Sequence, residues 1–320
     1  YEIKGKQAHS ELQRICTANI KSEVGKSTYT QMLNESSGIE TDLTVIAIDT
    51  NHYRIISGAV VRTHDKHHIL KHISKDLEFK DVTDDLVCLG IFGPKSRDLI
   101  SKISKDDFSN NNFKFGMGKY VKIGDKKVWA QRLSYVGELG FEIYINNYEA
   151  KEVYQLIVKE GKNHKLSHCG AHTMDTMRME SGFLHWGHDI SPEENQYEAG
   201  LNFAISYKKE TNFIGKDNLL KIKDKKINKR FVILTLKNNK PGSPLLLHEE
   251  PIYLEDKVIG RTTSGNYSFN YKKNISFGYI KNEYSTDELI KGNLFIEIEK
   301  KKYPAILELK PLKDKAFRLL

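Results

Sequence analysis

The segment from residue 231 onward most constrains the fold, because it consists of six short strand patterns separated by turn residues. Apolar and β-branched runs of four to seven residues alternate there with turn candidates at 255–257 and 300–302. Strands this short and closely spaced favour a small β-barrel or sandwich of about ninety residues. We expect the strands at residues 231–236, 251–254, 258–264, 275–280, 294–298 and 303–309. The lysine-rich stretch 221–230 precedes them, so we divide the chain into domains at 1–222 and 223–320.

The first of these regions alternates paired strands with helices. Strands at 43–49 and 53–57 are joined through Thr50 and Asn51, which is a hairpin signal. In a helix expected at 60–77, Ile69, Leu70 and Ile73 fall on the side that would face the core. Further helices are expected at 8–20, after Pro94, at 148–161 and at 171–181, and further strands at 1–5, 86–92, 119–123, 127–133 and 141–145. The order lacks the regular rhythm of a doubly wound fold, so it predicts an α+β region.

The charge of the chain limits its partners. Its 320 residues carry 50 Lys and Arg against 42 Asp and Glu, a formal charge of +8. Nine of the 50 are Arg, and readers of nucleic-acid sequence rely on Arg forks, so no nucleic acid is expected as a partner. The longest apolar run, 43–48, is far shorter than a membrane span, so no membrane is expected either. A positive field would still attract a small polyanion.

The cysteines and the glycine motifs exclude several kinds of site. Cys16, Cys88 and Cys169 are widely spaced and form no CxxC pair, which favours a reducing compartment. We therefore expect a cytoplasmic protein, or one of the mitochondrial matrix if the source is eukaryotic. No GxGxxG, GxxxxGK[ST], HExxH or GxSxG occurs, so no FAD or NAD site is expected within this chain.

A histidine-rich helix offers the one metal pattern in the sequence. His64, His68 and His72 recur every four residues and would share one face, where neutral imidazoles can ligate a metal. Neither a carboxylate nor a thiolate is placed to complete the site. The polar face of an amphipathic helix explains the same residues, so we expect no metal.

The stretch 134–142 carries the most specific chemistry. It reads Ser-Tyr-Val-Gly-Glu-Leu-Gly-Phe-Glu, so two glycines bracket a carboxylate between two expected strands. Phe141 and Ile143 fall on one face of the second strand and Glu142 on the other. An ordinary loop with one exposed glutamate is the simpler interpretation. The stretch nevertheless resembles the Tyr-x-Gly-Glu-x-Gly-x-Glu motif of the folate-binding aminomethyltransferase family, to which the glycine cleavage T-protein belongs.

Other segments resemble the same family in the same order. Residues 175–182 are similar to its Asp-Ser-Leu-Arg-Leu-Glu helix, and residues 187–190 and 198–201 to its Gly-x-Asp-Ile and Glu-x-Gly-Leu elements. Residues 184–187 and 212–216 most resemble the C-terminal half of dimethylglycine and sarcosine dehydrogenases. The resemblance implies an α+β fold whose three domains form a cloverleaf around a channel for tetrahydrofolate, with a C-terminal β-barrel as the last domain.

The resemblance also implies which residues bind the cofactor. Glu142 would hold the pterin, whose adjacent N–H and amino groups match a carboxylate, and Tyr135 would shape the site beside it. Phe203 falls where the family has an aromatic that packs on folate, although a core position explains it equally well. Ile56 and Gly58, at the end of the second hairpin strand, would complete the binding site.

The catalytic position is implied in the same way. The family's aspartate lies in Gly-x-x-Asp-Asp-Leu, and residues 38–43 read Gly-Ile-Glu-Thr-Asp-Leu, which retains the second aspartate as Asp42. Asp42 would stabilise a cationic iminium at the folate nitrogen, and the simpler alternative is a strand cap. Met174 stands where the T-protein has an arginine, and Gly58 where it has an asparagine. Both departures favour the dehydrogenase-like branch.

The implied function is one-carbon transfer. A methylene unit from dimethylglycine or sarcosine would be captured as 5,10-methylenetetrahydrofolate, after a flavin-dependent amine oxidase domain or subunit has produced the iminium. Family members carry a segment ahead of residues 1–5, so the chain is either shortened or the folate half of a larger flavoenzyme. A glycine cleavage T-protein or another folate-dependent demethylase is the alternative of the same class. A non-catalytic folate-binding module is the alternative of a different class, and the Lys-Gly-Cys motif of an iron–sulfur relative surrounds none of the cysteines.

Overall fold

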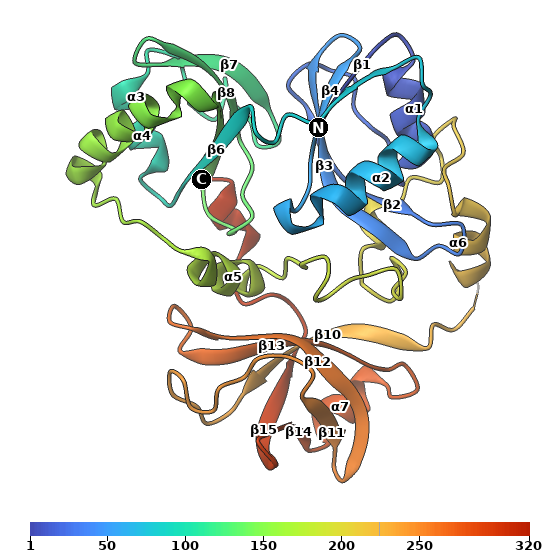
Figure 1. The fold of residues 1–320 in the computed structure, drawn as a ribbon. Helices are drawn as coiled ribbons and strands as arrows, with labels where there is room; N and C mark the ends of the chain where they lie inside the picture. The colour runs from blue at the N-terminus through green and yellow to red at the C-terminus, as the bar shows by residue number, and fades with distance from the viewer. Residues whose placement is uncertain (224) are drawn as a thin grey trace.

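The computed structural model describes residues 1–223 and 225–320, which form three lobes around a common centre (Figure 1). Two lobes combine sheets with helices and the third is a barrel, which confirms the α+β class and the cloverleaf arrangement. Residue 224 lies outside the described residues and falls within the stretch 221–230. The domain division between residues 222 and 223 therefore stays a prediction.

The first lobe is a five-stranded sheet in the order β2-β3-β4-β1-β5, with two helices packed on its apolar side. The predicted hairpin is the pair β3–β4, and β2 adds a third antiparallel strand to it. The elements are β1 (Glu2–Lys4), α1 (Ala8–Ile15), β2 (Ser27–Leu33), β3 (Ile39–Asp49), β4 (His52–Ile56), η1 (Ala59–Val61), α2 (Arg62–His72) and β5 (Glu78–Lys80).

Both helices of this lobe are shorter than the sequence pattern predicts. The buried ammonium of Lys209 accounts for the end of α1, because it donates to the main-chain carbonyls of Gln13, Cys16 and Ala18 and so binds groups that a longer helix would use itself. The expected inward side of α2 is also partly wrong, since Leu70 is 45% exposed.

The second lobe is a four-stranded sheet in the order β6-β9-β8-β7, with α3 and α4 on one face. Its other face meets the first lobe, where Trp129 and Tyr144 pack against Ile46 and Ile48. The elements are β6 (Leu86–Phe92), α3 (Ser96–Ile103), β7 (Gly118–Ile123), β8 (Lys126–Gln131), β9 (Gly140–Asn146), α4 (Asn147–Gly161) and η2 (Lys162–His164).

The chain then returns to the first lobe, so the two α+β lobes are interleaved. Helix α5 (Ala171–Glu180) lies between the second lobe and the barrel (Figure 1), and η3 (Asn202–Ala204) and α6 (Lys216–Lys223) lie beside the first lobe. The Ser206 N–H donates to the Thr17 carbonyl at 3.0 Å, and the Gln196 side chain donates to the Thr17 hydroxyl at 3.0 Å.

The third lobe is a closed barrel in the order β10-β13-β12-β11-β14-β15. All six strands that the sequence predicts are present, which confirms the C-terminal barrel. The elements are β10 (Lys229–Leu236), β11 (Pro251–Leu254), β12 (Lys257–Ser268), β13 (Lys273–Lys281), α7 (Thr286–Lys291), β14 (Leu294–Ile298) and β15 (Lys301–Glu308), and the short helix η4 (Lys315–Arg318) follows outside the barrel.

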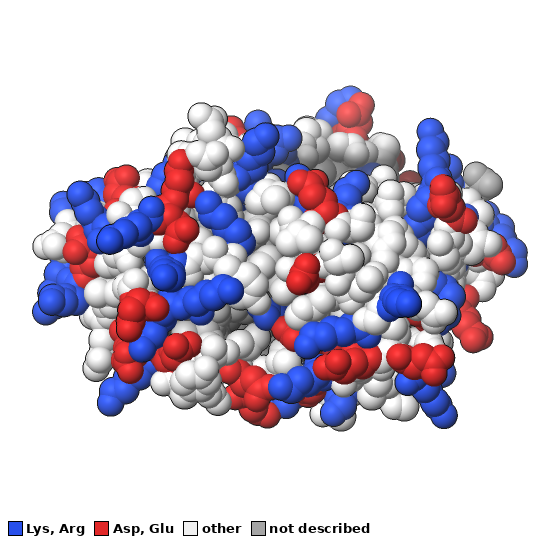
Figure 2. Space-filling model, turned by 90° about the horizontal axis from the view of Figure 1, so that it is seen from above, with Lys and Arg blue, Asp and Glu red and all other residues white. Residues whose placement is uncertain are grey.

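After β15 the chain leaves the barrel and runs back to the second lobe, where its end lies (Figure 1). Seen from above, positive and negative side chains are mixed over the face of the molecule (Figure 2). Within residues 1–223 and 225–320, no helix has both the length and the apolar character needed to cross a bilayer.

Candidate functional site

A cavity of about 1440 Å³ lies where the three lobes meet. Its walls come from β3 and β4, the stretch before β9, helix α5 and the loop after it, the barrel strands, and the segment after β15. The six residues that the resemblance singles out all line this cavity: Asp42, Ile56, Gly58, Tyr135, Glu142 and Phe203. The structure thus brings them together, and their individual roles remain predictions.

Asp42 faces the cavity because alternate residues of β3 point away from the buried core. Its Oδ1 accepts a hydrogen bond of 2.7 Å from Nε2 of Gln31, which lies opposite it in the β2–β3 register. Burial raises the pKa of Asp42 to about 6, against the opposing hydrogen bonds from Gln31 and Tyr29, and the charge of Asp65 adds to the rise. The carboxylate has neutral donors beside it, so its negative charge is poorly compensated.

Two glycines determine the shape of the turn before β9. Gly137 has a φ of +69°, and a Cβ there would lie 2.0 Å from Oγ of Ser181. A Cβ on Gly140 would lie 2.6 Å from the main-chain oxygen of Ile91. Both positions therefore need glycine, one for its backbone angle and one for the close approach of β6.

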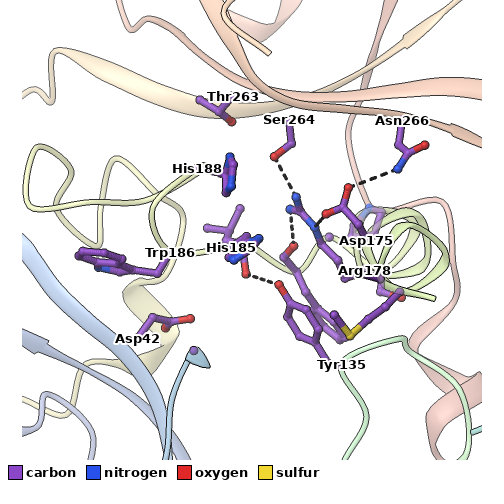
Figure 3. A pocket seen from close by; sticks show the side chains of 18 of the residues that line it. Asp42, Tyr135, Asp175, Arg178, His185, Trp186, His188, Thr263, Ser264 and Asn266 are labelled. Atoms are coloured by element: carbon purple, nitrogen blue, oxygen red, sulfur yellow. Dashed lines mark hydrogen bonds and ion pairs between the residues drawn. The ribbon is translucent and has the colours of Figure 1, made fainter. Parts of the chain in front are cut away.

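This turn directs Tyr135 into the cavity. The Tyr135 hydroxyl donates to the Leu184 carbonyl at 3.0 Å, and its ring stacks on Phe183 with centroids 6.1 Å apart. The contact fixes the ring against the loop that follows α5 (Figure 3).

The two carboxylates of the motif have opposite surroundings. Glu142 accepts a hydrogen bond of 2.5 Å from the Tyr144 hydroxyl, and burial raises its pKa. Glu138 instead forms an ion pair of 2.9 Å with Lys313, whose ammonium also lies 3.2 Å from Glu180. Glu138 therefore serves the packing of the C-terminal segment, whereas Glu142 lines the cavity and forms no ion pair with a Lys or Arg among the described residues.

Phe203 is not a core residue, so that alternative is wrong. Its side chain is 72% exposed, and its ring stacks on Tyr29 with centroids 6.2 Å apart and planes 22° from parallel. Ile56 packs at the edge of the cluster between the first two lobes. Gly58 precedes η1 in extended conformation, with a φ of −66°.

A buried ionic network lies on the side of the cavity opposite Asp42 (Figure 3). Arg178 of α5 is 1% exposed and donates to Asp189 at 2.5 Å, to Ser264 at 2.8 Å and to Asp175 at 2.8 Å. Asp189 accepts from the Thr263 hydroxyl at 2.6 Å and from the Ser264 hydroxyl at 2.8 Å. The network joins α5 and the loop of Asp189 to barrel strand β12.

One histidine of α2 has carboxylate neighbours. His64 lies 3.2 Å from Glu40 and 3.1 Å from Asp65, and its ring is 5.0 Å from that of Trp186. In the part of the chain that the structure describes, no three or more His, Cys, Asp or Glu side chains are grouped to hold a metal ion.

Sequence reasoning missed several residues that line the cavity or bind those that do. Tyr29 and Gln31 lie on β2, which was not predicted, although its Thr- and Tyr-rich run ahead of the hairpin is a strand signal. Arg178 and Asp189 belong to segments that carry the resemblance, yet no role was given to them. Arg318 enters from the C-terminal segment, and no local signal indicates that this segment turns back to the second lobe.

Comparisons with known proteins cover both parts of the chain. Residues 1–209 match the model described as the GCVT N-terminal domain, and residues 229–314 match the glycine cleavage T-protein C-terminal barrel domain. Two relatives are 32% identical over 98% of this chain: 4-methylaminobutanoate oxidase (formaldehyde-forming) from Paenarthrobacter nicotinovorans and mitochondrial dimethylglycine dehydrogenase from Rattus norvegicus. The chain spans 37% and 36% of their respective lengths.

A solved structure shows the same fold. The glycine cleavage system aminomethyltransferase T from Bartonella henselae matches with a TM-score of 0.84 at 20% identity. The match covers 98% of this chain and 83% of that one. At this identity the likeness concerns the fold, and it includes all three lobes because nearly the whole chain is covered.

Proposed function

Because this chain belongs to the glycine cleavage T-protein family of folate-dependent aminomethyltransferases, we propose that it transfers a one-carbon unit to tetrahydrofolate. The donor is an N-methylated glycine, dimethylglycine or sarcosine, and the product is 5,10-methylenetetrahydrofolate. The likeness to the rat dimethylglycine dehydrogenase supports this donor class. Since the chain spans little more than a third of that relative, we also propose that a flavin-dependent amine oxidase domain or subunit supplies the oxidised donor.

The observation that carries the proposal is that two carboxylates, Asp42 and Glu142, line the same cavity. Among the described residues, neither carboxylate forms an ion pair with a lysine or arginine, and burial raises the pKa of both. Carboxylates in this condition are suited to a ligand that brings its own donors or positive charge.

The residues of the cavity fit tetrahydrofolate. A volume of about 1440 Å³ exceeds that of ordinary small-molecule pockets, roughly 300–1,000 Å³, and so admits an elongated ligand. Glu142 offers a carboxylate to the N–H and amino groups of the pterin, and the exposed ring of Phe203 offers an apolar face. Tyr135 fixes the wall between them. When bound, tetrahydrofolate supplies the nitrogen that accepts the one-carbon unit.

Asp42 acts through its charge. A carboxylate beside developing positive charge interacts more strongly with the transition state than with free folate, so its effect appears in the rate of transfer. With a pKa of about 6, Asp42 is largely ionised at neutral pH and is still able to take up a proton under mildly acidic conditions.

The test is Asp42→Asn, which keeps the shape of the side chain and removes its charge. We expect affinity for tetrahydrofolate to stay within about tenfold, roughly 1.4 kcal/mol, while the transfer rate falls roughly a hundredfold or more. The assay measures formation of 5,10-methylenetetrahydrofolate from tetrahydrofolate and formaldehyde above the spontaneous rate. Glu40→Gln is the matched control, because Glu40 lies on the same face of β3 but contacts His64.

The outcomes separate the two interpretations of Asp42. If Asp42→Asn forms the product above the spontaneous rate as fast as the unaltered protein does, Asp42 is a strand cap and the catalytic role proposed for it is wrong. If the unaltered protein neither forms the product faster than the spontaneous reaction nor binds tetrahydrofolate, the proposed function fails as a whole.

A further inference from the structure

A buried row of hydrogen bonds leads from Asp42 into the first lobe. Nε2 of Gln31 donates to Oδ1 of Asp42 at 2.7 Å, and Oε1 of Gln31 accepts from Nε2 of Gln196 at 2.5 Å. The same nitrogen of Gln196 donates to the Thr17 hydroxyl at 3.0 Å, and that hydroxyl donates to the Ala204 carbonyl at 3.1 Å. Gln31, Gln196 and Thr17 are each 0% exposed, so bulk solvent does not reach these groups.

The far end of this hydrogen-bonded row determines its direction. The Ala204 carbonyl only accepts, so the Thr17 hydroxyl gives its hydrogen there and offers its oxygen to Gln196. The Thr30 hydroxyl is the more distant partner of Thr17, at 3.4 Å. Gln196 must therefore present its amino group, which also binds the side-chain oxygen of Gln31. The amino group of Gln31 is then the end that faces the carboxylate.

The row includes a cost that packing does not explain. Oε1 of Gln196 is buried and has no hydrogen-bond partner among the described residues. A buried acceptor without a partner costs free energy, so an apolar side chain would fill this place more favourably. The amide supplies in return the amino group on which the orientation of Gln31 depends.

An ionised carboxylate in a buried place needs a donor beside it. The titratable groups near Asp42 are Tyr29 of β2, Asp65 of α2 and Tyr135, and the charge of Asp65 favours the protonated form of Asp42. Hydrogen bonds from Gln31 and Tyr29 favour the ionised form. A phenol hydroxyl rotates about its own bond, whereas the amide of Gln31 is held in one direction. Turned round, Gln31 would present an oxygen to Asp42 and repel its charge.

We propose that Gln31 is a positioning residue of the transfer reaction, and that Gln196 acts through it by keeping its donor turned toward Asp42. The inference rests on the proposed function, which assigns to Asp42 the stabilisation of positive charge. Neither glutamine is among the described residues that line the cavity, so both act through Asp42. Gln196 belongs to the segment that returns to the first lobe, so the interleaving of the lobes contributes to the site.

The experiment measures the protonation of Asp42 directly. NMR titration of protein with isotope-labelled aspartate carboxyl groups follows it, and Asp42→Asn identifies the signal. We expect Gln31→Met, which keeps the length of the side chain and removes the donor, to raise the midpoint by about one pH unit. Gln196→Met should also raise it, although Gln196 has no hydrogen bond with Asp42. Gln13→Met is the matched control, because it removes another buried amide of the first lobe, one that binds the loop after α1.

The far end of the row allows a milder change. Thr17→Val removes the hydroxyl at nearly constant shape and should raise the midpoint less than the glutamine variants do, whereas Thr17→Ser should leave it in place. The transfer assay gives a second readout. The acidic limb of the kcat/KM profile should move with the NMR midpoint in Gln31→Met and Gln196→Met. A loss of packing alone would lower stability and leave the midpoint where it is.

Each result decides the inference. An unmoved midpoint in Gln31→Met overturns the role of Gln31, and unmoved midpoints in both Gln196→Met and Thr17→Val overturn the role of Gln196. An equal shift in Gln13→Met would assign the change to general loosening of the first lobe and overturn both roles. If the unaltered protein neither binds tetrahydrofolate nor forms product above the spontaneous rate, the proposed function fails, and the NMR titration still decides whether the glutamines control the charge of Asp42.

Discussion

Charged side chains at the cavity form two groups that differ in how their charges are compensated. Arg178 lines the wall formed by α5 and the barrel and forms an ion pair with Asp189, and both residues are 1% exposed. On the walls formed by the first two lobes, Asp42 and Glu142 accept hydrogen bonds from the neutral side chains of Gln31 and Tyr144. The first group is complete within the protein, whereas the second leaves negative charge for a ligand to meet.

The completed group has a structural purpose. Burial lowers the pKa of Arg178, but the charges of Asp189 and Asp175 outweigh it and leave the pKa raised. A buried pair of this kind adds little net stability compared with apolar packing, yet loss of one partner leaves the other charge buried and uncompensated. The pair therefore fixes the position of α5 against β12, and the cavity wall with it.

The largest effect should come from breaking the ion pair between Arg178 and Asp189. Asp189→Asn leaves the Arg178 guanidinium buried without its main counter-charge, and we expect a loss of about 3–5 kcal/mol in the free energy of unfolding. Denaturant titration followed by circular dichroism measures the change. Asp175→Asn removes the more exposed partner, with 34% side-chain exposure, and should cost clearly less. Equal losses in the two variants would show that Asp189 has no special place in the network.

Changes to the uncompensated carboxylates, Asp42 and Glu142, should affect ligand binding and transfer rather than stability. Glu142→Gln removes the charge that we propose faces the pterin, and we expect tetrahydrofolate binding to weaken by about 1.5–3 kcal/mol with little change in stability. Glu138→Gln is the control from the same motif, because its carboxylate belongs to Lys313, and it should leave affinity unchanged. Calorimetric titration that gives equal affinities for the two variants would remove Glu142 from the site.

The smallest effect concerns pH. Below a pKa of about 6, Asp42 holds a proton and loses its charge, so transfer should slow as the pH falls through that value. At pH 5, kcat/KM for tetrahydrofolate, which reports the pKa values of the unliganded protein, should be roughly tenfold below its plateau, or about 1.4 kcal/mol. The same profile measured for Glu142→Gln separates the contribution of Glu142 to binding. Asp42→Asn should lack this inflection, and an unchanged profile in that variant would assign the titration to another group.

The sequence predicts the features of the fold and of the site that depend on local signals. Strand patterns identified all six barrel strands, because alternation and turn residues are local signals. The resemblance placed Asp42, Tyr135, Glu142 and Phe203 in one site, and all of them line one cavity. Short motifs mark residues whose backbone is specialised, as the two glycines before β9 show.

The remaining features depend on contacts between distant segments. The end of α1 depends on Lys209, which is 196 residues from Gln13 along the chain, and no helix pattern contains that information. The exposure of Leu70 depends on how far the first lobe covers α2. Arg318 reaches the cavity only because the segment after β15 returns to the second lobe, and that return depends on Arg132 and Glu180.

The returning segment also has a consequence for synthesis on the ribosome. The first two lobes emerge early and are able to form their sheets, but one wall of the cavity comes from the barrel and another residue from η4. The two early lobes therefore remain without part of their cavity wall during translation of the barrel. A ligand is able to contact the complete wall of the cavity only after residue 318 has left the exit tunnel.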